Sequence, residues 1–481
     1  MLLVLDGNFR QDKGLSSVAI LSLGRARMTA FRTLAAIIGL CLVAAIGFVA
    51  IAWRWPIAPV PPPNTASFDR ELVRRGAQLA AAGDCNACHT APSGRAFAGG
   101  RALPTPFGTI YSTNITPDPD TGIGQWPEEA FRRALAEGVD REGRQLYPAF
   151  PYDHFTLLTH EDVSALYAFF MTREPVNATA PENEIPFPLN VRMLLAGWKL
   201  FFFRQGPYQP DAAQSAEWNR GAYLAEGLAH CGACHTPRNR LGGEKASERY
   251  GGGEIEGWNA YALNEASPAP VPWDTESLWL YLKNGWHDAH GVARGPMAAV
   301  VDNLATTPDA DIKAIATYVA SIAGPVSAER RQAAEALVAA ARKPAGKSAS
   351  GTETSGEHIF YATCAGCHES ERPLPFGGVN LILSTGPSGP NPHNILNIVL
   401  WGLPPADGAR SPIMPGFAAS LSDQQIAALL SYVRARFSDK PAWPDLERKV
   451  REARNAGRPD TVYPAHGIDP AEAMLNRGEG P

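Results

Sequence analysis

The pattern of apolar and polar positions divides the chain into one long apolar segment and several shorter amphipathic ones. Residues 34–53 (LAAIIGLCLVAAIGFVAIAW) are apolar throughout. Three later segments place apolar residues with the period of a helix, namely residues 159–167, 307–318 and 422–432. Thr159 and Ser422 are typical N-cap residues, and Pro308 fits the first helical position. We therefore expect a long apolar helix near the N-terminus and a repeated amphipathic helix after it.

The apolar segment has the length of a membrane-spanning helix. Its 20 residues suffice to cross the hydrocarbon core of a bilayer. Arg25, Arg27 and Arg32 precede it, and basic residues favour the cytoplasmic side. We expect a single-pass anchor in the inner (cytoplasmic) membrane, with the remainder of the chain in the periplasm.

A cleaved signal peptide is the alternative interpretation of this segment. Against it, the apolar run is longer than the 7–15 residues of a usual signal-peptide core. Translation can begin at Met1 or at Met28, because the residues after Met28 form a compact basic start to the apolar run. The sequence leaves both questions open.

Three copies of the pattern Cys-x-x-Cys-His carry the most specific chemistry. They use six of the seven cysteines and are Cys85/Cys88/His89, Cys231/Cys234/His235 and Cys364/Cys367/His368. Two thiols at this spacing can form thioethers to one haem, and the adjacent imidazole is then the proximal ligand of the iron. A zinc ribbon would pair two such motifs within a short span, whereas these begin 146 (231−85) and 133 (364−231) residues apart. The pattern predicts three covalently bound haem c groups.

Similar helix-like segments lead into the motifs, at Arg75-Gly76-Ala77 and Arg220-Gly221-Ala222, with a looser counterpart at Gly356. The repeat predicts tandem units. The expected boundaries are a cytoplasmic segment (1–33), the membrane anchor (34–53), a Pro-rich linker (54–66), unit one (67–205), unit two (206–343), a flexible linker (344–356), unit three (357–441) and a tail (442–481). A net charge of −5 gives no reason to expect a nucleic-acid partner.

A haem motif on an N-terminal helix and a second helix at the C-terminal end of each unit resemble class I cytochrome c domains. The expected fold is therefore mainly α, with three such domains in tandem after one transmembrane helix. In that family a methionine on the loop before the last helix is usually the second axial ligand of the iron. Met297 in Gly-Pro-Met and Met414 in Ile-Met-Pro-Gly-Phe fit this position in units two and three.

Unit one departs from this arrangement. Met297 follows His235 by 62 residues, and nearly the same offset from His89 reaches Phe150, which cannot bind iron. His154, on the same loop, is the preferred candidate for the sixth ligand. The alternatives are His160, Met171 and a five-coordinate iron that has no sixth ligand.

Four further segments, with the haem motifs, resemble the membrane-bound tri-haem cytochrome c subunits of bacterial periplasmic dehydrogenases acting on alcohols, gluconate or sorbitol. They are residues 108–117 (GTIYSTNITP), 146–152 (LYPAFPY), 414–417 (MPGF) and 437–443 (FSDKPAW). Phe150 stands where those subunits typically carry a methionine. The local sequence YPAFPYDHF instead resembles cytochromes that partner molybdenum hydroxylases such as nicotinate and aldehyde dehydrogenases.

The resemblance implies an electron-transfer subunit without catalytic residues of its own. Its partner would be a quinoprotein, flavoprotein or molybdenum hydroxylase, and the electrons would pass to ubiquinone or the terminal respiratory chain. Two alternatives stay open: a peroxidase-like haem enzyme with an open iron in unit one, and a cytochrome c subunit of a terminal oxidase.

Residues 190–205 (NVRMLLAGWKLFFFRQ) are apolar but too short to span a bilayer. We expect them to be buried between units or, alternatively, to contact the membrane or a partner. Residues 344–356 are rich in Gly and Ser, which predicts a mobile connection to unit three.

Overall fold

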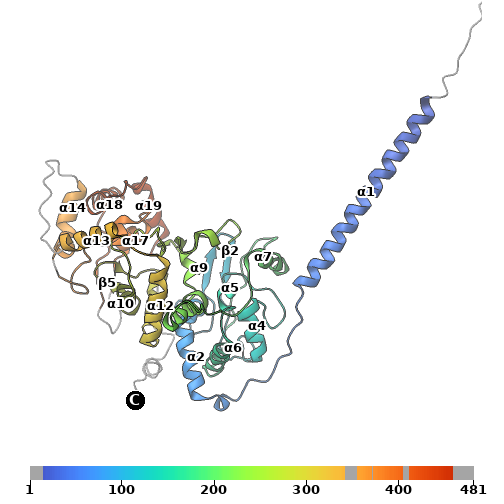
Figure 1. Cartoon of the computed structure of the whole chain (residues 1–481), viewed down its shortest axis with the longest axis horizontal. Coiled ribbons are helices and arrows are strands. Elements are labelled where there is room, and N and C mark those ends of the chain that lie inside the picture. Colours follow the sequence, from blue (N-terminus) through green and yellow to red (C-terminus); the bar gives the residue numbers. More distant parts are fainter. Residues whose placement is uncertain (1–14, 342–354, 371, 405–410, 459–481) are drawn as a thin grey trace, which may run out of the picture.

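The computed structural model describes residues 15–341, 355–370, 372–404 and 411–458. Helix α1 (Leu15–Ala52) projects away from a body made of the other elements (Figure 1). Its part Met28–Ala52 is long and apolar enough to cross a membrane. This stretch contains nearly all of the predicted anchor and begins six residues before it.

The body is mainly helical, as expected, with three small antiparallel hairpins among the described residues. In the part that precedes residue 206 the elements are α2 (Arg70–Ala82), α3 (Cys85–His89), β1 (Ala102–Thr105), β2 (Gly108–Tyr111), α4 (Glu128–Glu137), α5 (Tyr152–Phe155), α6 (His160–Met171) and α7 (Leu195–Phe202). The next part holds α8 (Ala216–Tyr223), α9 (Cys231–His235), β3 (Gly253–Ile255), β4 (Trp258–Ala260), α10 (Thr275–Asn284), β5 (Trp286–His287), β6 (Gly291–Val292), α11 (Pro296–Leu304), α12 (Asp309–Ile322) and α13 (Ala328–Ala341). The last part holds α14 (Ser355–Thr363), α15 (Ala365–His368), α16 (Thr385–Ser388), α17 (His393–Trp401), α18 (Asp423–Phe437) and α19 (Leu446–Ala456).

One helix pair recurs three times, as α2 with α6, α8 with α12 and α14 with α18. A glycine lies at each crossing. A Cβ on Gly76 would meet the Ala165 carbonyl oxygen at 2.0 Å, and the corresponding distances are 1.9 Å from Gly221 to Ala314 and 2.2 Å from Gly356 to Ala428. Because no side chain fits at these distances, the glycines allow the two backbones to touch. The internal repeat is thus a repeated close helix crossing.

The three predicted amphipathic helices are confirmed as α6, α12 and α18. The Thr159 hydroxyl accepts a hydrogen bond from the Asp162 N–H at 3.2 Å. Ser422 forms a capping box with Gln425, in which each side chain bonds the backbone of the other residue. Helix α12 begins at Asp309, one residue after the predicted start, and Pro308 is its N-cap.

The first two units pack as one body, because a single hydrophobic core runs through both. Leu79 and Phe169 from the first unit and Leu224 and Ile315 from the second belong to the same buried cluster. The third unit has its own core. That core continues past residue 441, since Trp443, Leu446 and Val450 are buried in it with α18.

Asparagines on and just before α17 dock the third unit on strand β4 of the second. The Asn259 N–H donates to the Asn394 side chain at 2.7 Å, and the Asn394 amide donates back to the Asn259 carbonyl at 3.0 Å. Asn391 and Asn397 add bonds to Asn259 and Gly257. The predicted mobile linker lies almost entirely outside the described residues, and these bonds hold unit three in one orientation.

Candidate haem sites

Each Cys-x-x-Cys-His motif lies on or beside a short helix that follows the glycine-bearing helix of its unit. These short helices are α3, α9 and α15. The residue before the first cysteine takes a left-handed conformation in two units, at Asp84 (φ 53°) and His230 (φ 37°). This conformation ends the preceding helix and turns the chain sharply into the motif. None of the six motif cysteines forms a disulfide, so each is available for a thioether bond to haem.

The three motif histidines make the same hydrogen bond. Nδ1 of His89 lies 2.7 Å from the Thr113 carbonyl oxygen, Nδ1 of His235 lies 2.7 Å from that of Tyr261, and Nδ1 of His368 lies 2.8 Å from that of Val379. A carbonyl oxygen only accepts, so Nδ1 carries the proton and Nε2 keeps its lone pair.

Burial lowers the pKa of each of these histidines, although the bond to the carbonyl works in the opposite direction. A lowered pKa favours the neutral imidazole, which is the form that binds a metal. The hydrogen bond also fixes the orientation of the ring, as in proximal histidine sites generally. The residues therefore fit a haem iron at all three motifs.

A continuous cavity of about 1570 Å³ connects the three motifs. That is larger than the roughly 300–1,000 Å³ of a site for one small ligand. Its walls include Cys88 from the first motif, His235 from the second and His368 from the third. Met297 and Met414 line the same cavity.

The two methionines reach the cavity from different local structures. Met414 is in an extended segment that pairs with Leu403 through two backbone bonds of 2.8 and 3.0 Å. Met297 was expected on a loop, but it lies in the first turn of α11, after Gly295 and Pro296. The loop prediction relied on the Gly-Pro sequence before Met297. Proline is, however, favoured at the first position of a helix, and Pro296 begins α11 here.

In unit one, none of the candidate sixth ligands lies in an obvious ligand position. Phe150 packs on Phe155 with ring centroids 5.3 Å apart. His160 is exposed at the start of α6. Met171 is 1% exposed within the hydrophobic core.

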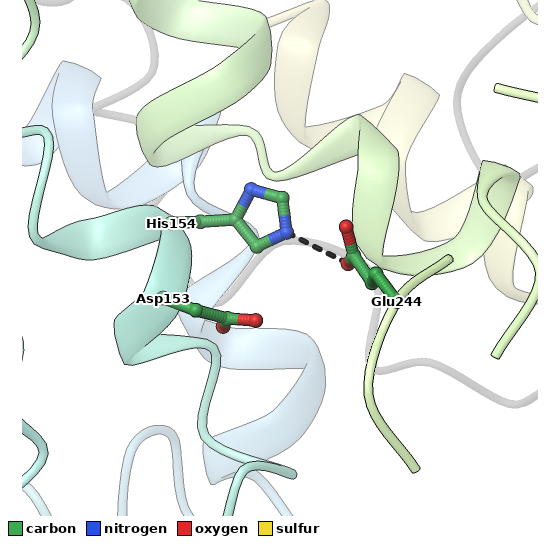
Figure 2. A group of neighbouring side chains, drawn as sticks. All are labelled: Asp153, His154 and Glu244. Carbon is green, nitrogen blue, oxygen red and sulfur yellow. Dashed lines mark hydrogen bonds and ion pairs between the residues drawn. The ribbon is translucent and has the colours of Figure 1, made fainter. Parts of the chain in front are cut away.

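His154 contacts the second unit instead. Its Nδ1 donates to the Glu226 carbonyl oxygen at 2.6 Å, and its Nε2 lies 3.0 Å from Oε1 of Glu244. Figure 2 shows the ring directed at Glu244, with the Asp153 carboxylate beside it. His154 can bind the first iron only if it gives up one of these bonds, so its placement does not support the predicted ligand role.

The charges around His154 favour its protonated form. Burial opposes protonation, but the hydrogen bond to Glu244 and the negative charges of Asp153 and Glu244 outweigh it and raise the pKa of His154 above its usual value near 6.5. Burial works against ionisation of Glu244 as well, yet His154 and Arg238 lower the pKa of its carboxyl. An imidazolium–carboxylate pair thus bridges the first two units.

This bridge predicts a pH-dependent contact. The pKa of His154 is higher in the folded state than in the unfolded state. Its contribution to the unfolding free energy is therefore complete below about pH 6.5 and is lost as the pH rises through the pKa of the folded state. The lowered pKa of Glu244 contributes stability that is lost only as the pH falls well below about 4.3. We expect the unfolding free energy of the first two units to fall above neutral pH, and His154→Ala should abolish that fall.

The same substitution should cost about 2 kcal/mol at pH 6, because it leaves the Glu244 carboxylate without its buried partner. Thermal unfolding of His154→Ala, with His160→Ala as the exposed control, measures this loss. If His154→Ala instead converts one haem to a high-spin spectrum while stability is unchanged, His154 is an iron ligand and not a bridge.

A second polar contact joins the first haem motif to unit two. The Asn303 amide on α11 donates to Asp84 and, at 2.9 Å, to Asn86. Burial raises the pKa of Asp84 to about 7, although the bond from Asn303 lowers it. Arg101 reaches across to Glu256 at 3.1 Å. The first two motifs are therefore fixed relative to each other by bonds between units.

The sequence reasoning missed the carbonyl groups that orient the motif histidines. They belong to residues 24, 26 and 11 positions after His89, His235 and His368, and no side-chain pattern marks a backbone acceptor. Thr113 does lie within the segment 108–117 that carried the family resemblance. That segment therefore has a structural role beside the first motif histidine.

Three repeated helix crossings, each with a Cys-x-x-Cys-His motif after its first helix and a fixed imidazole in that motif, define a c-type cytochrome. Comparisons with known proteins agree. The chain is 38% identical to the fructose dehydrogenase cytochrome subunit of Gluconobacter japonicus, over 82% of this chain and 85% of that protein. It is 38% identical to the gluconate 2-dehydrogenase cytochrome c subunit of Pantoea cypripedii, over 76% and 86%. The chain belongs to the family of dehydrogenase cytochrome c subunits.

A longer relative is also similar. The chain is 46% identical to a nicotinate dehydrogenase subunit of Pseudomonas putida over 88% of its own length, and it spans 35% of that protein. The family model for cytochrome c oxidase, cbb3-type, subunit III matches residues 351–433. That match covers only the third unit, whereas the dehydrogenase subunits match most of the chain.

Proposed function

We propose that the chain is a tri-haem c-type cytochrome that carries electrons from a partner dehydrogenase to ubiquinone or the terminal respiratory chain. The observation that carries this proposal is the identical Nδ1 bond of His89, His235 and His368. When bound, haem c supplies a reversible one-electron carrier. Three such sites on one chain suit electron relay.

The residues of each site have distinct roles in this proposal. The cysteine pairs Cys85/Cys88, Cys231/Cys234 and Cys364/Cys367 attach the haems, and the motif histidines are the proximal ligands. Met297 and Met414 are the second axial ligands in units two and three, supported by their place on the cavity that His235 and His368 also line. Methionine ligation raises a haem reduction potential. The surrounding apolar residues exclude water from the site.

The fold keeps the three sites in one arrangement. A shared core and the His154–Glu244 bridge fix units one and two, and the asparagine contacts fix unit three on β4. A relay benefits from this rigidity, because the distances between carriers then stay constant. We assign the three cytochrome domains to residues 67–205, 206–343 and 357–441, with α19 packed on the third.

We place these domains in the periplasm, held by α1 in the inner membrane. The support is the apolar stretch Met28–Ala52, which is exposed along most of its length, and the arginines that precede its apolar centre.

The catalytic partner is proposed to be a separate dehydrogenase. The 46% identity to a nicotinate dehydrogenase subunit exceeds the 38% to the fructose and gluconate subunits. This difference supports a partner of the molybdenum hydroxylase kind, which the loop around Phe150 resembles, over a quinoprotein or a flavoprotein.

Isolation of the chain from its own membranes tests this function. A dehydrogenase should co-purify, and its substrate should reduce all three haems under anaerobic conditions. The variant Cys364→Ser/Cys367→Ser should still accept electrons in units one and two but should reduce quinone more slowly. If no dehydrogenase is present, or if its substrate leaves every haem oxidised, the relay function is excluded.

A second candidate function rests on two observations: both nitrogens of His154 form bonds to unit two, and Phe150, which packs on Phe155, offers no ligand atom. The first iron would then have an open position, as in a peroxidase-like haem enzyme. Carbon monoxide added to the reduced protein should bind at one haem, and peroxide should be consumed at that site. If no carbon monoxide spectrum forms, all three irons have six ligands and the enzyme function is excluded.

A further inference from the structure

A patch of large apolar side chains covers the outer side of α7 and the segment before it. We call it the α7 patch. Its most exposed members are Phe187, at 80%, and Phe201, at 74%. The complete set is Phe187, Val191, Leu200 and Phe201. Leu189 and Leu194 are exposed as well, but they line the cavity between the motifs. Large exposed apolar side chains gathered along one short segment mark an interaction site.

The opposite side of α7 is firmly attached to unit one. Ala196 is buried, and the Lys199 ammonium donates to the carbonyl oxygens of Glu137 and Gly138, at 2.6 and 2.8 Å, at the C-terminal end of α4. A cation is favourable at that end of a helix. Lys199 also donates to Oε1 of Gln145 at 2.6 Å. Because this inner side is anchored, the helix cannot rotate to bury the patch.

The same network reaches the end of α1. The Gln145 amide donates to the Ala52 carbonyl oxygen at 2.9 Å, at the last residue of α1. Helices α1 and α7 are in direct contact, and the C-terminal end of α1 lies near α7 in Figure 1. A Cβ on Gly197 would lie 3.5 Å from the Phe48 ring. The position of α7 relative to α1 is therefore fixed.

This contact sets the depth of α7. Phe48 precedes the end of α1 by four residues, which corresponds to about 6 Å along the helix axis. It belongs to the stretch Met28–Ala52 that can span a membrane. A helix that touches Phe48 from the side therefore lies level with the last turn of the span, where the hydrocarbon core of a bilayer meets the headgroups. Trp53 and Trp55 lie just beyond the span, with their rings edge to face and the ring centroids 5.9 Å apart. Tryptophan is typical of the interface between hydrocarbon and headgroups.

We propose that the α7 patch inserts into the outer surface of the lipid bilayer beside α1. The partner is the lipid itself, with acyl chains against Phe201 and Leu200 and headgroups near Arg204, which is exposed. Short apolar elements with basic flanks bind membranes in this way. The inference rests on the proposed anchor α1. Its consequence is that unit one is held against the membrane in one orientation, and does not swing on a single helix.

Photo-cross-linking in native membranes tests this inference. The photoreactive residue p-benzoylphenylalanine replaces Phe201 in the full chain, and irradiated peptides are analysed for attached phospholipid. Ile46 on α1, 69% exposed, is the position that reports on the anchor itself. Gln424 on α18 of unit three is the control, because it is exposed and does not line the cavity between the motifs. The haem spectrum of each variant verifies that it folds. If the variant labelled at position 201 does not fold, the photoreactive residue is placed at position 200 instead.

We expect lipid adducts at positions 46 and 201 and none at 424. Adducts at 46 with none at 201, or a cross-link from 201 to a protein, would overturn the α7 inference and leave the anchor intact. Equal lipid adducts at 201 and 424 would overturn it too, because the lipid contact would then be unspecific. If position 46 gives no adduct, the anchor itself is wrong, and the inference fails with it.

Discussion

Replacing Gly221 by alanine should destabilise the first two units by about 3 kcal/mol or more and should reduce haem attachment at Cys231 and Cys234. Added volume in a packed interior typically costs about 1–3 kcal/mol. Here the added Cβ would lie 1.9 Å from the Ala314 carbonyl oxygen. That oxygen belongs to the backbone of α12 and cannot move aside as a side chain would, so the two helices must separate.

Gly227→Ala is the matched control in the same unit. It lies in a helical turn just before the motif, and the nearest atom to its added Cβ is 3.5 Å away, which is an ordinary contact. Thermal unfolding and the haem content of both variants measure the difference. If Gly221→Ala and Gly227→Ala are equally stable and fully loaded with haem, the close crossing of α8 and α12 does not hold the second unit together.

Replacing Met414 by leucine should lower the reduction potential of one haem by on the order of 0.1–0.3 V, within the roughly 0.8 V that axial ligands span. Leucine has a volume similar to that of methionine, so packing changes little, but it offers no sulfur to the iron. The third haem should also become high-spin and bind carbon monoxide. A redox titration followed by absorbance resolves the shifted haem from the others.

Met171→Leu is the control for this substitution. Met171 is buried in the core of α6 and does not line the cavity between the motifs. Its replacement should leave all three potentials unchanged. If Met414→Leu leaves them unchanged as well, the sixth ligand of the third iron is another residue, and the site assigned from the Ile-Met-Pro-Gly-Phe sequence is wrong.

The sequence predicted those parts of the fold that depend on local patterns. The caps at Thr159 and Ser422 formed as expected because a capping bond joins residues only three positions apart. Helix α19, near the start of the C-terminal tail, likewise follows a local pattern of apolar and charged residues. The two cysteines and the histidine of each haem motif also lie within five consecutive residues, so no tertiary information is needed to recognise the motif.

Contacts between distant residues could not be predicted in this way. The loop sequence around His154 suggested a free imidazole near the first iron. Its actual partners, Glu226 and Glu244, are 72 and 90 residues away. Docking of unit three through Asn259 and Asn394 spans 135 residues. Asparagine side chains are common on surfaces, and nothing local distinguishes one that pairs across an interface.

The apolar segment 190–205 shows the same limit. Its composition predicted burial between units, with membrane or partner contact as the alternative. The structure buries Ala196 and exposes Leu200 and Phe201. Which side of α7 faces inward is decided by Lys199, whose bonds are to the end of α4. A single polar residue in an apolar run therefore determined the orientation of the helix.

The number of haems on the intact chain is the most direct test of the account. The purified full-length protein should have a mass equal to the chain plus three haems, and its alkaline pyridine spectrum should give three haem c per chain. Each Cys→Ser double substitution in a motif should remove one haem and leave two. A wild-type chain that carries two haems or fewer after complete maturation would contradict the three-site relay.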